Sequence, residues 1–74
     1  MDKKTNQKLM LRAEMLKKSL TFDDVSKELD ISVTTFNSKL NDFETFKLKE
    51  ILTLQNLLEL SVSERNAIFF EPLE

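Results

Sequence analysis

The chain of 74 residues contains no glycine, and its only proline, Pro72, lies two residues from the end. Glycine and proline build most tight turns and interrupt helices, and no Asn-Gly or Asp-Gly pair is present to close a β-hairpin. Helix caps must therefore set the boundaries inside the chain. We expect an all-α fold, a compact bundle of about five short helices that forms one domain over residues 1–74.

The residue types that are absent limit the chemistry. Without histidine or cysteine, the chain lacks the commonest general base, the commonest zinc ligand and any disulfide. The adjacent carboxylates of Asp23 and Asp24 have no base, nucleophile or glycine-rich phosphate loop beside them. No apolar run reaches about 18 residues, and the first residues are too polar for a secretory signal. We therefore expect a cytoplasmic, non-enzymatic protein with no cofactor, metal site, small-molecule substrate or membrane contact.

The first expected helix starts after a cap at Thr5 or Asn6 and runs to about Lys18. One apolar stripe of helical spacing holds four residues: Leu9, Ala13, Leu16 and Leu20. Leu11 and Met15 form a second apolar stripe on the same helix. This helix should therefore bury at least one face.

Two shorter helices follow, and only residues 30–32 separate them. Thr21 can cap the first of these helices, with Asp24 at its third position. Asp23 and Asp24 also lie beside the positive end of the helix dipole, where carboxylates are favourable. Ile31 is expected to fill the corner, and a joint this short forces the two helices to cross steeply.

The next helix is expected from Val33 to about Asn41, capped by Ser32, with Phe36 and Leu40 facing inward. Its outward side then carries short hydrogen-bonding side chains: Thr34, Asn37, Ser38 and Asn41. A short helix, a tight corner and a second helix with a polar outer face form a helix-turn-helix, whose second helix lies in the DNA major groove. There Asn37 can pair with an adenine, Thr34 and Ser38 with bases or phosphates, and Val33 with a thymine methyl. The alternative is an ordinary solvated helix face.

Residues 42–46 are expected to form a loop before a fourth helix over about residues 47–60. A last helix is expected from the capping box at residues 61–64 to about Phe70, before Pro72. The fourth helix is expected to bury a broad apolar face: Leu48, Ile51, Leu52 and Leu58, widened by Leu54, Leu57 and Leu60.

Four further apolar residues lie in the loop and near the end of the chain: Phe43, Ile68, Phe69 and Phe70. They exceed what a small bundle easily covers, which favours a contact with a second copy of the chain at this place. Alternatively, Phe69 or Phe70 closes the core under the first helix.

Several segments of the sequence match a known pattern: Leu11-Arg12, Leu20-Thr21, Val25-Ser26, Leu29, Ile31-Ser32, Thr35-Phe36-Asn37, Lys39-Leu40-Asn41, Phe46-Lys47-Leu48 and Glu64-Arg65-Asn66-Ala67-Ile68-Phe69-Phe70. In these segments, roughly from Leu9 to Phe70, the chain resembles the small Cro/repressor (XRE-type) helix-turn-helix proteins of temperate phages and mobile elements of Gram-positive bacteria. The resemblance implies a lambda-repressor-like bundle whose second and third helices bind operator DNA, often as a dimer on a palindromic operator, in a lysis/lysogeny switch. The positions that it assigns to DNA contact are Ser32, Val33, Thr34, Asn37, Ser38, Lys39 and Asn41.

Two positions depart from the family pattern. The family usually has a phosphate-binding glutamine at the start of the second helix, where this chain has Phe22. The usual glycine at the corner is replaced by Asp30, which is therefore expected to adopt a positive φ. Phe22 either folds back onto the bundle or stays exposed.

Charge is unevenly distributed along the chain, whose net charge is -2. Residues 1–18 hold six basic residues against two acidic ones, whereas residues 19–31 hold one lysine against four acidic residues. DNA binding relies on basic side chains, so the acidic second helix opens an alternative. In that alternative the chain is an antirepressor or modulator of repression that binds a phage repressor through Phe22, Asp23, Asp24 and Lys27. Operator DNA, a phage repressor and a second copy of the chain are thus the expected partners.

Overall fold

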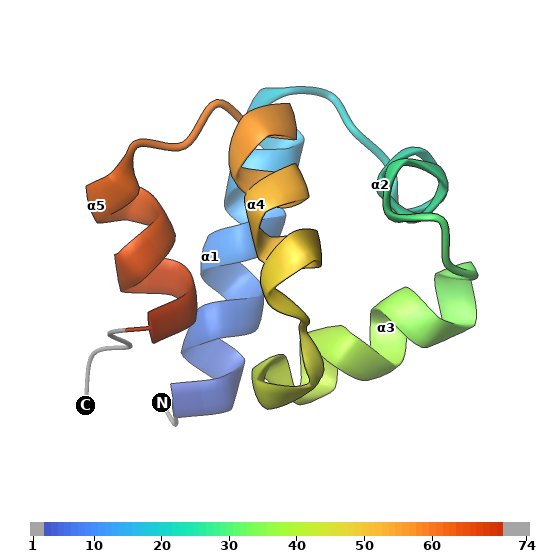
Figure 1. Cartoon of the computed structure of the whole chain (residues 1–74), viewed down its shortest axis with the longest axis horizontal. Coiled ribbons are helices and arrows are strands. Elements are labelled where there is room, and N and C mark those ends of the chain that lie inside the picture. The colour runs from blue at the N-terminus through green and yellow to red at the C-terminus, as the bar shows by residue number, and fades with distance from the viewer. Residues whose placement is uncertain (1–2, 71–74) are drawn as a thin grey trace.

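The structure, a computed structural model, describes residues 3–70, with side chains from Thr5 onward. Over these residues the chain is helical and has no strand (Figure 1). Its elements are α1 (Lys3–Lys17), α2 (Phe22–Leu29), α3 (Val33–Asn41), the short 3-10 turn η1 (Phe43–Thr45), α4 (Leu48–Leu57), α5 (Val62–Arg65) and the π-helical turn η2 (Asn66–Phe70), which continues α5. The expected all-α bundle of about five helices is confirmed, while the expected stop at Pro72 lies outside the described residues.

Side-chain caps begin three of the helices as the sequence predicts. At the start of α2 the Asp24 N–H donates to Thr21 Oγ1 (3.1 Å), and the Thr21 N–H donates to Asp24 Oδ2 (2.9 Å). Ser61 and Glu64 form the same reciprocal pair at the start of α5, and Ser32 caps α3. Because each carboxylate accepts a backbone N–H from its cap residue, the pKa values of Asp24 and Glu64 are lowered from their ordinary values.

Two helix boundaries differ from the prediction. α1 begins at Lys3, so Thr5 and Asn6 lie inside the helix and do not cap it. α4 ends at Leu57, earlier than the expected end near residue 60, because the chain turns away through Glu59 with a φ of 54°. Near the end of α4 the sequence offers no strong stop signal.

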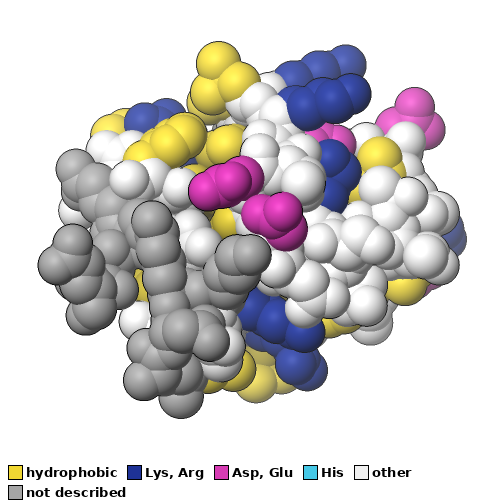
Figure 2. All heavy atoms as spheres, turned by 90° about the horizontal axis from the view of Figure 1, so that it is seen from below, with side chains coloured by type: hydrophobic (Ala, Val, Ile, Leu, Met, Phe, Trp, Pro, Cys, Tyr) yellow, Lys and Arg dark blue, Asp and Glu magenta, His cyan; other side chains and the backbone are white. Residues whose placement is uncertain are grey.

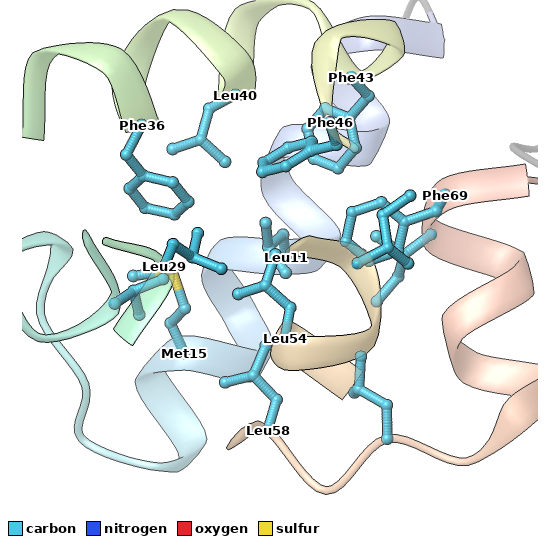
Figure 3. Packing of buried hydrophobic residues seen from close by; sticks show 14 residues of the cluster. Leu11, Met15, Leu29, Phe36, Leu40, Phe43, Phe46, Leu54, Leu58 and Phe69 are labelled. Atoms are coloured by element: carbon cyan, nitrogen blue, oxygen red, sulfur yellow. The ribbon is translucent and has the colours of Figure 1, made fainter. Parts of the chain in front are cut away.

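A cluster of buried side chains joins the four helices α1, α2, α3 and α4 to the short turns η1 and η2 (Figure 3). Its members are Leu11, Met15, Val25, Leu29, Phe36, Leu40, Phe43, Phe46, Ile51, Leu54, Leu58, Leu60, Ile68 and Phe69. Leu11 of α1 and Leu54 of α4 are completely buried and lie near the centre of the cluster. The hydrophobic effect on this cluster is therefore what holds α1, α2, α3 and α4 together.

Of the two apolar stripes of α1, the second is the buried one. Leu11 and Met15 lie in the core, whereas the stripe of Leu9, Ala13 and Leu16 faces solvent, with Leu16 exposed by 79%. The side of α1 that carries Leu11 also carries Gln7, whose buried Nε2 donates to the Ile68 carbonyl (3.0 Å). Both stripes have helical spacing, so periodicity cannot choose between them, and packing of η2 against the Gln7 side decides the orientation.

The apolar face of α4 is also narrower than expected. Ile51, Leu54 and Leu58 are buried, but Leu48 is exposed by 63% and Leu52 by 46%. At 100° per residue the three buried side chains share one narrow arc, and Leu48 and Leu52 fall outside it. The expectation that Leu48 and Leu52 are core residues is therefore wrong.

Aromatic rings close the core between η1 and η2. The Phe43 and Phe46 rings lie 5.1 Å apart, Phe46 and Phe69 5.6 Å, and Phe36 and Phe46 6.3 Å, all three pairs edge-on or steeply tilted. The expected contact of Phe43, Ile68 and Phe69 with a second copy is therefore wrong, because these side chains are buried against one another and α1. The alternative in which Phe69 closes the core is observed, and in this group only Phe70 is exposed.

The corner between α2 and α3 has the predicted backbone. Asp30 adopts a φ of 58° and a ψ of 43°, and its N–H donates to the Lys27 carbonyl (3.1 Å). Ile31 is partly buried against the core, as expected, and its N–H donates to the Ser26 carbonyl (3.0 Å). Figure 1 shows α2 nearly end-on and α3 lengthwise, so the two helices cross steeply.

Asp30→Gly is expected to raise the free energy of unfolding by about 0.5 to 1 kcal/mol, because glycine adopts a positive φ without the steric cost that Asp30 bears. Removing a carboxylate from the negative end of α2 acts in the same direction. Urea denaturation followed by circular dichroism measures the change. Asp30→Ala is the control and should destabilise the protein; a glycine variant less stable than the natural chain would contradict the prediction.

Candidate nucleic-acid interface

The polar face of α3 points to solvent as the sequence predicts. Phe36 and Leu40 are completely buried, whereas Thr34, Asn37, Ser38 and Asn41 are exposed on the opposite side of the helix. Val33, in the first turn, is exposed as well. Figure 2 views the molecule from the side on which α3 lies and shows a mostly uncharged surface, with acidic side chains near the middle of the view and Lys and Arg side chains mainly toward its top and bottom.

Within residues 5–70, three of these side chains have no hydrogen-bond partner. Thr34, Asn37 and Ser38 make no side-chain hydrogen bond to another residue among positions 5–70. Each is short, so little conformational entropy is lost when it binds a partner. Thr34 lies one helical turn before Asn37 and Ser38, a spacing that lets a single ligand surface contact all three.

The two polar residues at the ends of this face are already hydrogen-bonded. Ser32 Oγ accepts the Thr35 N–H (3.0 Å) and donates to Thr35 Oγ1 (2.9 Å), so its hydroxyl stabilises the start of α3. Asn41 Oδ1 accepts from Lys8 Nζ (3.1 Å). In this contact the amide N–H₂ group of Asn41 stays free to donate a hydrogen bond to a partner. The Ser32 hydroxyl, in contrast, already donates and accepts a hydrogen bond at the start of α3.

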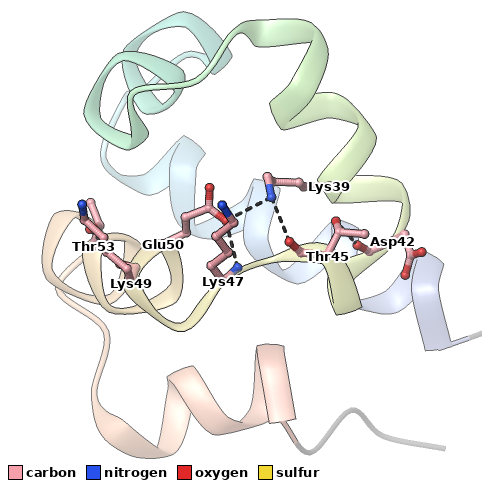
Figure 4. A network of polar contacts seen from close by, with 7 residues as sticks. All are labelled: Lys39, Asp42, Thr45, Lys47, Lys49, Glu50 and Thr53. Carbon is pink, nitrogen blue, oxygen red and sulfur yellow. Dashed lines mark hydrogen bonds and ion pairs between the residues drawn. The ribbon is translucent and has the colours of Figure 1, made fainter.

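Lys39 does not belong to the exposed face. Its Nζ lies 3.1 Å from Glu50 Oε1 and donates to the Thr45 carbonyl (2.8 Å), and the two charged side chains are only 11% and 10% exposed (Figure 4). Glu50 Oε1 also accepts the Lys47 N–H (2.8 Å) at the start of α4. The expected DNA contact by Lys39 is therefore not supported, because its charge is paired inside the molecule and ties α3 to α4.

Glu50 and Thr45 were not singled out from the sequence. The one available signal was the position of Glu50, three residues after Lys47, which is the usual place for a carboxylate that accepts the first N–H of a helix. Nothing in the sequence pairs Glu50 with a residue eleven positions earlier on another helix.

Three lysines, one on α1 and two at the start of α4, have no internal ion pair in the described part of the chain. Lys8 reaches Asn41 at one end of α3, and Lys47 and Lys49 are exposed at the start of α4. None of the three has a carboxylate within 4.0 Å in the described part of the chain. Arg12, by contrast, lies over the Phe22 ring, with its Cζ 5.7 Å from the ring centroid.

The acidic surface of α2 has a different character. Phe22 is half-buried and packs edge-on against Phe36 at 5.4 Å, so it folds back onto the bundle and is not an exposed anchor. Asp23 and Lys27 form an exposed ion pair of 3.2 Å, and the Asp24 carboxylate is held by the cap of α2. The α2 surface therefore offers carboxylates to a partner without an aromatic anchor.

Searches among protein-family models, curated proteins and solved structures found no match for this chain. Within the described residues, no helix is long and apolar enough to cross a membrane. Among the same residues, no group of three or more acidic, histidine or cysteine side chains is placed to hold a metal ion.

Glu50→Gln is expected to lower the free energy of unfolding by about 1.5 to 3 kcal/mol, because it leaves the Lys39 ammonium nearly buried without a counter-charge. Lys39→Met should cost a similar amount, and the double variant less than the sum of the two. Urea denaturation of the three variants gives this coupling energy.

The exposed pair of Asp23 and Lys27 provides the control for this experiment. Asp23→Asn should change stability by less than about 1 kcal/mol, since solvent screens that pair. Equal effects of Glu50→Gln and Asp23→Asn would contradict the structural role of the Lys39–Glu50 pair.

Proposed function

We propose that the chain is a small phage-type transcriptional regulator that binds operator DNA through the outer face of α3. The observation that carries the proposal is the set of Thr34, Asn37 and Ser38, exposed and unbonded on a short helix beside a steep corner. This arrangement supports a helix-turn-helix in which α3 enters the major groove and α2 lies across it. The resemblance to small Cro/repressor proteins is the second support.

In this proposal each exposed side chain has a chemical role. Asn37 carries both a donor and an acceptor and can bond the N6 and N7 atoms of one adenine together. Thr34 and Ser38 bond base edges or phosphates, and the Val33 side chain contacts a thymine methyl. Lys8 and Lys47 neutralise phosphates beside α3. With few cations available, base contacts contribute a larger share of the affinity than in a strongly basic regulator.

Asn37→Ala is expected to weaken binding to the cognate operator by about 1 to 3 kcal/mol and to relax the preference at one base pair. The probe is the intergenic DNA beside the gene for this chain, and the measurement is a mobility shift over a protein titration. Ser63→Ala is the control, because Ser63 is an exposed polar residue on α5, away from α3. An unchanged footprint and affinity in Asn37→Ala would contradict the proposal.

A second candidate function is favoured by the acidic surface of α2. The carboxylates of Asp23, Asp24 and Glu28 are exposed there, and Lys27 is paired with Asp23. The DNA-binding face of a repressor is basic, so an acidic surface of this kind can complement it. In this alternative the chain is an antirepressor that binds a phage repressor and keeps it from DNA.

Asp23→Lys is expected to abolish association with the repressor encoded beside this chain, as measured by gel filtration of the mixture. Asp23 is the better position for the reversal, since Asp24 also caps α2 and a lysine there would destabilise the helix. Glu44→Lys, an exposed charge reversal on η1, is the control. Persistent co-elution of Asp23→Lys would exclude the antirepressor alternative, and a mobility shift with and without the repressor separates the two functions.

A further inference from the structure

α4 carries an apolar face that no described part of the chain covers. Leu48 and Leu52 lie one turn apart and are exposed by 63% and 46%. We call the surface that they share with their neighbours the α4 face, and its members line one shallow hollow: Leu48, Lys49, Leu52, Thr53 and Asn56. A domain of this size has few apolar side chains to spare, so two leucines aligned on one exposed stripe indicate an interaction surface.

The charges beside the α4 face have both signs and lack internal partners. Lys47 and Lys49 at the start of α4 line a second hollow together with Glu28 and Asp30 of the α2 side. None of these four makes an ion pair within residues 5–70. Glu28 also borders Thr53, Asn56 and Leu57, further along α4. The surface is therefore basic at the start of α4, apolar in the middle and acidic along the α2 side.

We propose that the α4 face binds the α4 face of a second copy of this chain, with the two α4 helices antiparallel. A two-fold contact must be self-complementary, because each copy contributes the same surface. Antiparallel pairing sets the Leu48 and Leu52 side chains of the two copies against each other. It also brings Lys49 of each copy to Glu28 of the other, so that two opposite-charge contacts flank the apolar centre. Parallel pairing places both Lys49 side chains at the same end, where neither meets Glu28.

The exposed stripe of α1 is a poorer surface for self-association. Leu9, Ala13 and Leu16 are flanked by Arg12 and Lys17, and the nearby Glu14 is already paired with Lys17 at 3.0 Å. Two copies packed on this stripe would bring their Arg12 side chains together, and α1 holds no unpaired carboxylate to offset them, which opposes association. The α4 face has no such conflict.

The pairing is independent of the proposed function. α3 lies beside the amino-terminal end of α4 (Figure 1), so the antiparallel contact leaves both α3 faces uncovered, at opposite ends of the dimer. The test therefore uses the protein alone, and its outcome does not depend on whether α3 binds DNA.

Sedimentation velocity over a concentration series, without DNA, measures the self-association. The natural chain of 8.7 kDa is expected to shift toward twice that mass as its concentration rises. Leu52→Glu is expected to stay monomeric at every concentration, because it places two carboxylates in the apolar centre. Leu16→Glu makes the same change on α1 and should dimerise like the natural chain. Circular dichroism confirms that both variants are folded. A natural chain that stays monomeric, or a loss of association in Leu16→Glu alone, would overturn the proposal.

A charge exchange tests the antiparallel orientation. Lys49→Glu and Glu28→Lys are each expected to raise the dimer dissociation constant roughly tenfold, because each creates two like-charge contacts. An equimolar mixture of the two variants should recover dimerisation, since both flanking contacts in the mixed dimer again join opposite charges. Failure of the mixture to recover would exclude this geometry.

Discussion

The burial of Phe36 and Leu40 decides which side of α3 meets solvent, and the proposal of operator binding depends on that orientation. Both side chains are completely buried, and the Phe36 ring packs edge-on against rings from α2 and from the segment after η1. Burying each such side chain contributes about 1.5 to 3 kcal/mol, more than a typical surface hydrogen bond. α3 therefore cannot rotate about its axis without a large loss of stability, and its polar face is presented in one fixed direction.

An ion pair inside the molecule limits how much positive charge α3 presents on its surface. The ion pair between Lys39 and Glu50 ties α3 to the start of α4, but it also removes a cation from the surroundings of the polar face. Lys8, at the end of that face, and Lys47, just before α4, remain without an internal ion pair, against an acidic surface on the adjacent α2. The two proposed functions consequently use different sides of the corner: operator binding uses the uncharged face of α3, whereas repressor binding uses the carboxylates of α2. In these proposals negatively charged DNA contacts the α3 face, and a basic repressor surface contacts the α2 carboxylates.

The features that could be predicted from the sequence are those that a few neighbouring residues determine by themselves. Thr21, Ser32 and Ser61 each cap a helix as expected, and Asp30 adopts the left-handed conformation that a corner without glycine requires. α3 has one apolar stripe, so its inward and outward sides were predictable together with Thr34, Asn37 and Ser38. α1 and α4 each carry more apolar residues than one face can bury, and the choice between faces depends on packing against distant segments. The pairing of Lys39 with Glu50 depends on the same long-range packing and left no local signal.

The exposed leucines of α1 and those of α4 have different charged neighbours. This difference makes the α4 surface suited to self-association and the α1 surface unsuited to it. On α1 the exposed leucines lie among basic side chains, so that surface repels a copy of itself. On α4 they lie between unpaired lysines and unpaired carboxylates, so that surface complements itself under a two-fold rotation. The proposed recognition by α3 and the proposed association through α4 thus occupy different helices. An antiparallel dimer directs its two α3 faces to opposite ends, so pairing does not add a second contact to one straight duplex, and self-association and DNA binding are expected to be thermodynamically uncoupled.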